Sequence, residues 1–191
     1  MGEKHMDMRV KRTLKSVQEA FYGLAQEMSL DQITITNLTQ RASINRKTFY
    51  LHYKSMDDLL ETVSEESYNN IMEALKPNIV AGNVESCIRT FFQYLNNCTG
   101  IQRILLCDPK NQAFCHQVIG RVLHSDIFQT LYQKTPFPSL TESYMTSIAT
   151  IYQTWLIEKP INIEELIQYT TALINGGFKA AEHMELPEPT H

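Results

Sequence analysis

The chain has 191 residues, of which 43% are hydrophobic and 20% charged, and its formal net charge is −4. This length and composition fit one large or two small globular domains with a real core. No apolar run reaches the roughly 18 residues that a membrane span requires, and no signal-peptide pattern is present, so we expect a cytoplasmic protein without a membrane partner.

Positive charge is concentrated near the start of the chain. Residues 8–54 contain eight cations and three anions, which gives this segment a charge of +5 and leaves the rest at about −9. A basic segment on an acidic body suggests that the N-terminal part alone has a polyanion as its partner.

The apolar spacing is helical almost throughout, and no strand-like alternation or internal repeat is found. Apolar residues from Val10 to Met28 follow steps of three and four, which predicts a first helix with one apolar face. Thr34, with Asn37 three residues on, predicts the N-cap of a short second helix. Asn45 is the next candidate N-cap, and a third short helix is expected from Lys47 to Tyr53.

The rest of the chain predicts longer helices. Ser55 with Asp58 forms a capping box for a fourth helix, which Pro77 is expected to stop. Asn162 with Glu165 caps the last helix. The later helices are expected at 83–97, 101–107, 111–133, 139–158 and 163–184. We therefore expect an all-α fold, with an N-terminal domain over 8–56 and a second helical domain over 57–191.

The two short helices after the first long one predict a helix-turn-helix unit. In such a unit the first turn of the second short helix faces base edges in the major groove of DNA. Arg46, Lys47 and Thr48 would occupy that turn. Cations at a helix N-terminus oppose the helix dipole, so their placement makes sense if an anion lies in front of them.

The residues that follow have side chains that donate to phosphates. Tyr50, His52 and Lys54 would set the position of the protein on DNA without contributing sequence information. The alternative is a solvated cationic surface without function, over a core made by Phe49 and Tyr53. For Phe49 we expect the core position in either case.

The segment ITITNLTQRASINRKTFYLHYKSMDDLL, from Ile33 to Leu60, resembles the DNA-binding domain of the TetR/AcrR family of bacterial transcription regulators. The positions that fit the family pattern are Thr34, Leu38, Ala42, Ile44, Thr48, Phe49, Tyr50, His52, Tyr53 and Leu59. The resemblance implies that double-stranded operator DNA is the partner. The DNA-binding candidates are Thr34, Thr36, Asn45, Arg46, Lys47, Thr48, Tyr50, His52 and Lys54.

Three positions depart from that pattern, of which Asn45 only replaces the usual serine cap without changing its chemistry. Ser43 stands where glycine usually makes the turn, so the backbone there is expected to be strained or differently turned. Met56 stands where a phosphate-binding lysine is common, and Lys54 is the nearest residue that can take its place.

The resemblance further implies that the C-terminal part binds a ligand and forms a homodimer through the last two long helices. Their apolar stripes give the interface candidates Tyr144, Ile148, Ile151, Trp155, Leu166, Thr170, Leu173 and Gly177. Gly176 and Gly177 would let two helices approach closely. The alternative is that these stripes form a core within one chain. The tail also has a weaker similarity to regulators of the dihydroxyacetone-kinase type.

The small-molecule effector is not identified by the sequence. Aromatic and polar side chains that could line a cavity between helices are Phe91, Tyr94, Phe114, His116, His124 and Tyr152, and for each of them an ordinary core or surface role is the alternative. His116 beside Cys115, with His124 two turns on, matches no common metal site, so no metal is expected. The four cysteines are expected to be reduced, small buried side chains.

These patterns together predict a sequence-specific transcriptional repressor that a small molecule releases from a palindromic operator. A ligand-dependent activator and a helical interaction protein without DNA binding are the alternatives. No nucleophile elbow, glycine-rich phosphate loop, HExxH motif or carboxylate pair is found, so we expect no catalytic residue and no cofactor.

Overall fold

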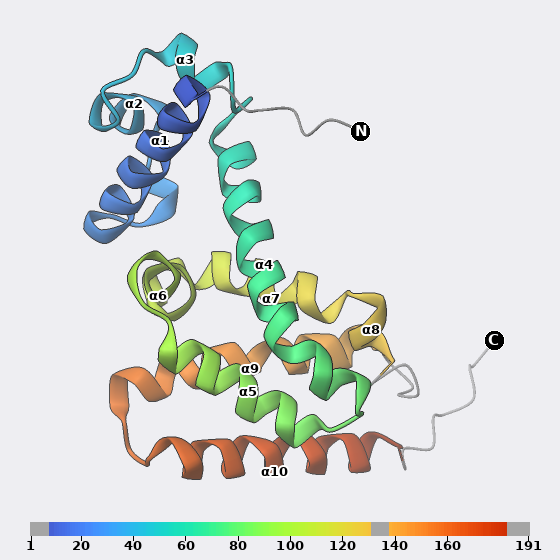
Figure 1. Ribbon diagram of the computed structural model, residues 1–191. Helices are drawn as coiled ribbons and strands as arrows, with labels where there is room; N and C mark the ends of the chain where they lie inside the picture. The colour runs from blue at the N-terminus through green and yellow to red at the C-terminus, as the bar shows by residue number, and fades with distance from the viewer. Residues whose placement is uncertain (1–7, 131–137, 183–191) are drawn as a thin grey trace, which may run out of the picture.

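The computed structural model describes residues 8–130 and 138–182, and within these ranges every regular element is a helix (Figure 1). This confirms the all-α prediction. In chain order the helices are α1 (Met8–Glu27), the 3₁₀ helix η1 (Leu30–Gln32), α2 (Ile35–Arg41), α3 (Arg46–Tyr50), α4 (Met56–Val80), α5 (Val84–Asn97), α6 (Gly100–Cys107), the 3₁₀ helix η2 (Pro109–Asn111), α7 (Gln112–Leu123), α8 (Asp126–Gln129), α9 (Pro138–Glu158) and α10 (Ile163–Glu182).

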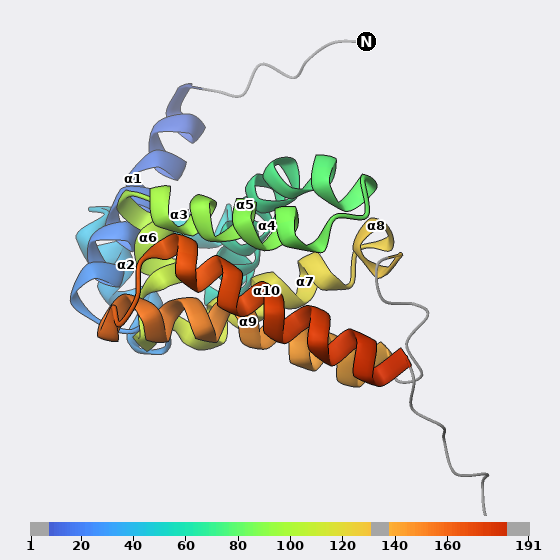
Figure 2. The ribbon, with the colours of Figure 1, turned by 90° about the horizontal axis from the view of Figure 1, so that it is seen from below.

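The helices form two groups that α4 connects. Residues 8–55, which we call the head, hold α1 to α3, and α5 to α10 form the body. In Figure 1, α4 runs from the head at the top into the body, and α10 lies at the opposite end. Within the body α4 packs against α5 and α7, while α7 packs against α9 and α10 against α5. Seen from below, α9 and α10 lie along the same side of the body (Figure 2).

The head has a small core of its own, to which all three helices contribute. Val17, Phe21 and Leu24 follow steps of four and three on α1 and are at most 5% exposed. Leu38 of α2 and Phe49 of α3 are fully buried against them. The expected core position of Phe49 is confirmed, and its burial fixes which side of α3 faces solvent.

Local hydrogen bonds start the helices where the sequence predicts. The Thr34 amide donates to Asn37 Oδ1 at 2.9 Å, and the Asn37 amide donates to Thr34 Oγ1 at 3.3 Å. Asn45 accepts from the Lys47 amide at 2.9 Å. Each of these bonds satisfies an amide that the first helical turn leaves without a partner. Asn162 and Glu165 exchange a similar pair of bonds before α10.

The cap before α4 differs in one detail from the predicted capping box. Ser55 Oγ accepts from the Asp58 amide at 3.2 Å, as expected. The Asp58 carboxylate, however, accepts from the amide of Lys54, at 2.8 Å. This bond fixes the backbone between α3 and α4 and so holds the end of the head to the start of the long helix.

The turn between α2 and α3 confirms the expected strain at Ser43. Its φ is +55°, in the left-handed region that costs a residue with a Cβ about 1–2 kcal/mol. The Ser43 amide donates to Gln40 O at 3.2 Å, and the Ile44 amide donates to Thr39 O at 3.0 Å. This is the Schellman arrangement that ends many helices, here without the usual glycine.

The prediction that Pro77 stops the fourth helix is wrong, because α4 continues to Val80. A proline inside a helix costs about 3 kcal/mol. The apolar stripe nevertheless continues past it, since Leu75 and Ile79 are 4% and 2% exposed. The helix ends at Val80, and Gly82 makes the turn that follows, because its φ is +66° and its amide donates to Ile79 O at 2.9 Å.

Two other predicted boundaries also need correction. The helix expected over 111–133 is broken at His124 and Ser125, because Ser125 Oγ caps the separate helix α8 by accepting from the Phe128 amide. Helix α3 covers Arg46–Tyr50 rather than continuing to Tyr53. The last residues of the predicted ranges 111–133 and 163–184 lie outside the described part of the chain.

The four cysteines are buried and free, as expected. Burial raises the pKa of Cys87 to about 11 and the pKa of Cys107 and Cys115 to about 12. These thiols are therefore neutral at physiological pH. Among the described helices, none has the length and hydropathy that a membrane crossing requires.

A second contact joins the head to the body, through η2. The buried amide side chain of Asn111 accepts from the Leu30 amide at 3.3 Å and donates to Ile104 O at 3.1 Å. Lys110 Nζ donates to the carbonyl of Gln26 at 3.3 Å. Helix α1 also packs against α6. The head is therefore held by side-chain contacts as well as by α4.

Candidate DNA-binding surface

The exposed side of α3 carries the cations that the sequence singles out. With Phe49 pointing into the core, Arg46, Lys47 and Tyr50 are exposed and Thr48 is half-buried. Helix α3 and the first residues of α1 both lie at the end of the molecule far from α10 (Figure 1). The structure thus places the first turn of α3 on an outer surface, as a groove-binding helix requires.

Residues of α2 and α3 converge on this surface. The Arg46 guanidinium donates a hydrogen bond to Thr36 Oγ1 on α2, and both residues are exposed. Among the described residues, no carboxylate pairs with Arg46, Lys47 or Lys54, whereas Arg41 of the same head binds Glu27 at 2.7 Å. The positive charge of α3 is therefore not neutralised within the head.

Two aromatic contacts with the buried Phe49 support the exposed side of α3. The Tyr50 ring meets Phe49 edge-on, with centroids 5.6 Å apart, and remains 55% exposed. Tyr53 lies 5.5 Å from Phe49 and is half-buried, and burial raises the pKa of its phenol. The contact with Phe49 thus holds the Tyr50 ring in an exposed position, whereas Tyr53 is part of the core.

The remaining DNA-binding candidates are either engaged in helix capping or lie outside α3. The side-chain oxygens of Thr34 and Asn45 already accept amide hydrogens as helix caps. His52 is half-buried in the turn after α3, and Lys54, two residues further along the chain, is exposed.

Leu51 was missed by the sequence interpretation. It is 79% exposed, the most exposed large hydrophobic residue of those described, and directly follows α3. The signal was available, because a helix turns by about 200° over two residues. A buried Phe49 therefore implies an outward Leu51 on an otherwise polar surface.

The candidate dimer residues divide into three groups by exposure. Ile148, Leu166 and Thr170 are at most 7% exposed and leave almost no side-chain surface for a partner. Ile151 and Trp155 are half-buried. Exposed apolar residues on α9 and α10 include two candidates and three that were not predicted: Tyr144, Leu173, Leu140, Ile157 and Tyr169.

Gly177 allows a close approach, but within one chain. A Cβ at this position would lie 3.1 Å from a ring carbon of Tyr144. The Tyr144 hydroxyl donates to Leu173 O at 2.8 Å on the same helix. The glycine therefore lets α9 and α10 fit together along this edge.

The six candidate ligand residues are not brought together. Phe114 and Tyr152 are core residues, and Tyr152 packs against Phe92 with centroids 5.3 Å apart. His116 shares a hydrogen bond with Thr150 at 2.8 Å. Tyr94 borders an open groove of α4, α5 and α6. Of two hollows found among residues 8–130 and 138–182, this groove is lined by Tyr94 and the other by Phe91, and neither is lined by a second candidate.

Phe91, alone among the candidates, lines a partly open apolar cavity, which has about 40 Å³ of free volume. The cavity lies between α4, α5, α7, α8 and α9, and its walls include Leu75, Val122, Phe128 and Met145. Sequence reasoning missed it because no local pattern shows which faces of five separate helices leave space between them.

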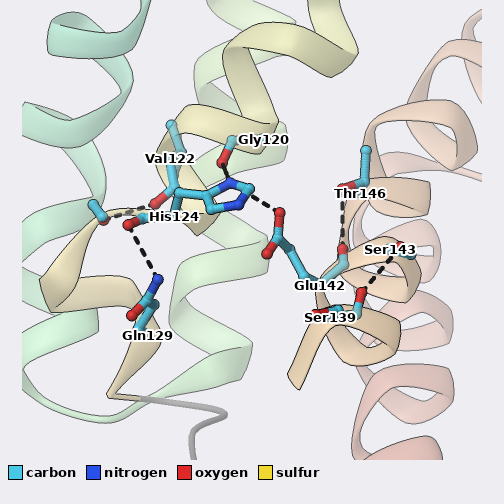
Figure 3. A network of polar contacts seen from close by, with 9 residues as sticks. Gly120, Val122, His124, Gln129, Ser139, Glu142, Ser143 and Thr146 are labelled. Carbon is cyan, nitrogen blue, oxygen red and sulfur yellow. Dashed lines mark hydrogen bonds and ion pairs between the residues drawn. The ribbon is translucent and has the colours of Figure 1, made fainter. Parts of the chain in front are cut away.

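His124 lies at one edge of this region and ties three elements together (Figure 3). Its Nδ1 lies 2.8 Å from Gly120 O and 2.9 Å from Glu142 Oε1 of α9. The Gln129 side chain of α8 donates to the His124 carbonyl at 3.3 Å. The end of α7, the short α8 and the start of α9 are thereby connected.

The chain is similar to curated helix-turn-helix transcriptional regulators, among them proteins of Bacillus subtilis and Haemophilus influenzae, and no family model matches it. YxbF of Bacillus subtilis is 39% identical over 74 residues, which make up 38% of this chain and 20% of that protein. A regulator of Haemophilus influenzae is 31% identical over 115 residues, or 56% of each chain. The chain thus spans a fifth and about half of the lengths of these relatives.

A solved structure has the same overall fold. The fatty acid degradation regulator FadR of Bacillus halodurans aligns with a TM-score of 0.52 at 11% identity, and the alignment covers 90% of this chain and 96% of that one. At this identity the similarity concerns the fold alone. In sequence and in fold, the chain therefore resembles all-helical helix-turn-helix transcriptional regulators, as the TetR/AcrR pattern of residues 33–60 implies.

Proposed function

We propose that the chain is a DNA-binding transcriptional regulator, and not an enzyme, whose α3 enters the major groove. The observation that carries this proposal is the pair Arg46 and Lys47, exposed at the start of α3 and without a carboxylate partner among the described residues. The similarity to helix-turn-helix regulators supports it. We take 8–56 as the DNA-binding domain and 57–191 as the regulatory domain.

The side chains divide into two kinds of contact. Arg46 leaves Thr36 to bind guanine O6 and N7, the bidentate contact that its guanidinium favours, and Lys47 and Thr48 contact neighbouring base edges. Leu51 offers an apolar surface for a thymine methyl group. The phosphate contacts come from the polar groups at the edges of the surface: Thr34, Thr36, Asn45, Tyr50, His52 and Lys54.

The operator is palindromic because the protein acts as a homodimer with one head per chain. The exposed apolar residues of α9 and α10 support this part of the proposal, since Tyr144, Tyr169 and Leu173 are 40%, 59% and 42% exposed. Helix α10 lies at the end of the body that is farthest from the head, and α9 packs against it (Figure 1). A dimer formed there leaves both heads free for DNA.

The regulator is a repressor that a small molecule in the body releases from DNA. Helix α4 has 25 residues and is about 37 Å long, and it begins directly after the head. A ligand that prefers one angle of α4 changes the separation of the two heads. Couplings of about 1–3 kcal/mol between two such sites are usual, which corresponds to a 5- to 150-fold change in DNA affinity.

Selection of bound sequences from random duplexes, followed by fluorescence anisotropy, tests the DNA contacts. Arg46→Ala is expected to relax the preference at one base position, at a cost of about 1–3 kcal/mol. Lys54→Ala is expected to weaken all sequences alike and to lower the salt slope by about 0.9. Arg103→Ala, which removes an exposed arginine of the body, serves as the control. An unchanged sequence preference in Arg46→Ala would contradict the assignment of α3.

A further inference from the structure

We propose that Leu51 recognises the C5 methyl group of one pyrimidine in the major groove, whether that pyrimidine is thymine or 5-methylcytosine. This role of Leu51 rests on the DNA-binding function proposed above. It adds to that function a dependence on cytosine methylation, because a methylated cytosine at this position of the operator binds more tightly than an unmethylated one.

Leu51 belongs to the side of α3 that carries the candidates for base contacts. It is the C-cap of the helix, with φ −71° and ψ −20°, so its backbone still follows the helical path. Its amide donates to Lys47 O at 3.2 Å and to Thr48 O at 3.3 Å. Residues three and four positions apart lie on one side of a helix. Leu51 therefore stands one turn beyond Lys47 and Thr48, on their side.

The surroundings of Leu51 are cationic. Single exposed leucines are common on protein surfaces, but this one is 79% exposed and lies within five positions of the exposed residues Arg46, Lys47 and Lys54. Within residues 8–130 and 138–182, none of these three cations forms an ion pair with a carboxylate. An apolar side chain thus stands among positive charges that have no partner of their own.

These charges decide which partner brings an apolar group to Leu51. A second copy of the head would bring the same cations and be repelled. The major groove of DNA offers phosphates on both sides for the cations and, between them, the C5 methyl group of thymine. Helix α3 lies at the outer end of the molecule, far from α10, where the groove can reach it (Figure 1).

An aliphatic side chain recognises the methyl group and no other feature of the base. In the major groove thymine presents an O4 acceptor where cytosine presents an N4 donor. The Leu51 side chain has no hydrogen-bonding group, so it does not distinguish these atoms. It distinguishes a methylated C5 from an unmethylated one, because contact with the methyl group removes apolar surface of both partners from water. Thymine and 5-methylcytosine carry this group on the same carbon and are equivalent for the contact.

The length of one helical turn places the methylated base relative to the other contacts. Lys47 and Leu51 are four residues apart, which corresponds to about 6 Å along the helix axis. Successive base pairs are about 3.4 Å apart. With α3 along the groove, the methyl group lies about two base pairs from the base edge that Lys47 contacts.

A deoxyuridine scan with the full-length chain tests the contact, because deoxyuridine differs from thymidine only by the missing methyl group. Each thymine of the operator selected from random duplexes is replaced in turn, and affinity is measured by fluorescence anisotropy. One position in the half-site is expected to weaken binding about fourfold for each methyl group removed, which corresponds to about 0.8 kcal/mol. If no thymine shows this loss, the proposal is overturned.

Two substitutions assign the contact to Leu51. Leu51→Asn keeps the branched shape but replaces the two methyl groups by polar atoms, and it is expected to bind the thymine and deoxyuridine duplexes equally. Leu51→Met stays apolar and is expected to retain most of the preference for thymine. Val80→Asn removes an exposed apolar side chain of α4 and is expected to keep the full preference. A folded Leu51→Asn that still prefers thymine about fourfold would show that another residue contacts the methyl group.

A cytosine pair tests the equivalence of the two methylated bases. Cytosine and 5-methylcytosine are placed in turn at the position that the scan identifies, and they differ in the methyl group alone. The unchanged chain is expected to bind the 5-methylcytosine duplex about fourfold more tightly for each methyl group. Leu51→Asn is expected to bind both duplexes alike. Equal affinities of the unchanged chain for the two duplexes would contradict the proposal.

The role of Leu51 and the DNA-binding function fail in different ways. A chain that selects no duplex sequence from the random pool would remove the DNA-binding function and the role of Leu51 with it. A chain that selects an operator but binds its thymine and deoxyuridine forms alike would keep the DNA-binding function and remove the role of Leu51 alone.

Discussion

Ser43 shows how one side-chain carbon influences the turn on which the candidate DNA-binding surface depends. Its φ of +55° places a Cβ in the left-handed region. Ser43→Gly removes about 1–2 kcal/mol of strain but gives the unfolded chain more freedom, which costs about 0.4–1 kcal/mol. We therefore expect a net stabilisation of about 0.5–1 kcal/mol, measured by urea unfolding. Ser43→Ala retains the Cβ, and an equal gain in that variant would show that strain is not the cause.

The buried thiols lead to a prediction about reactivity. The nucleophile is the thiolate, and with a pKa of about 12 for Cys107 and Cys115, roughly one thiol in 10⁴ is ionised at pH 8. The native protein is therefore expected to react slowly with a disulfide reagent such as DTNB. In guanidinium chloride all four thiols should react within minutes. Rapid reaction of a thiol in the native state would contradict the burial of the cysteines.

At the residue scale, the sequence predicted interactions correctly where the two partners lie close together along the chain. Thr34 and Asn45 form their capping bonds with residues two or three positions away, and the strain at Ser43 follows from the need to turn within three residues. The ligand candidates did not converge, because their environment depends on distant partners. His116, for example, binds Thr150, 34 residues further along. Residue type alone does not determine such pairs.

At the scale of elements, the contact of η2 with the head predicts that Asn111 connects the body to the head. Asn111→Ala leaves the buried Leu30 amide without its acceptor, which costs about 1–3 kcal/mol. We expect faster hydrogen exchange of the Leu30 amide, measured by NMR, and a changed operator affinity because the head is held less firmly. Asn96→Ala, at an exposed position on α5, is the control. Unchanged exchange at Leu30 would show that Asn111 does not hold the head.

Helix boundaries show where local signals compete with packing. A proline predicts the end of a helix, yet α4 passes through Pro77 because Ile79 continues its buried stripe and Gly82 provides a better stop. At 111–133 the reverse occurred, since Ser125 caps a new helix inside a segment that was predicted to be one helix. The type of element was predictable in both cases, but its end depended on which neighbouring helix covers it.

At the scale of the whole molecule, a charge placed among the exposed apolar residues of α10 is expected to break the proposed dimer. Leu173→Glu places a charge on the apolar surface of α9 and α10, where Leu173 is 42% exposed. We expect the mass from light scattering to fall from twice 22.1 kDa to 22.1 kDa. Val80→Glu puts the same charge on an exposed valine of α4 and should leave the mass unchanged. A dimer that survives Leu173→Glu would have to form through another surface.

The bond between Leu30 and Asn111 also has a consequence for how the protein is made. The two residues are 81 positions apart, and ribosomes add about 5–20 residues per second, so the acceptor follows its donor by roughly 4–16 s. The core of α1, α2 and α3 is complete long before η2 has been synthesised. A nascent head can thus collapse early, but its Leu30 amide stays bonded to water until the body arrives and docks.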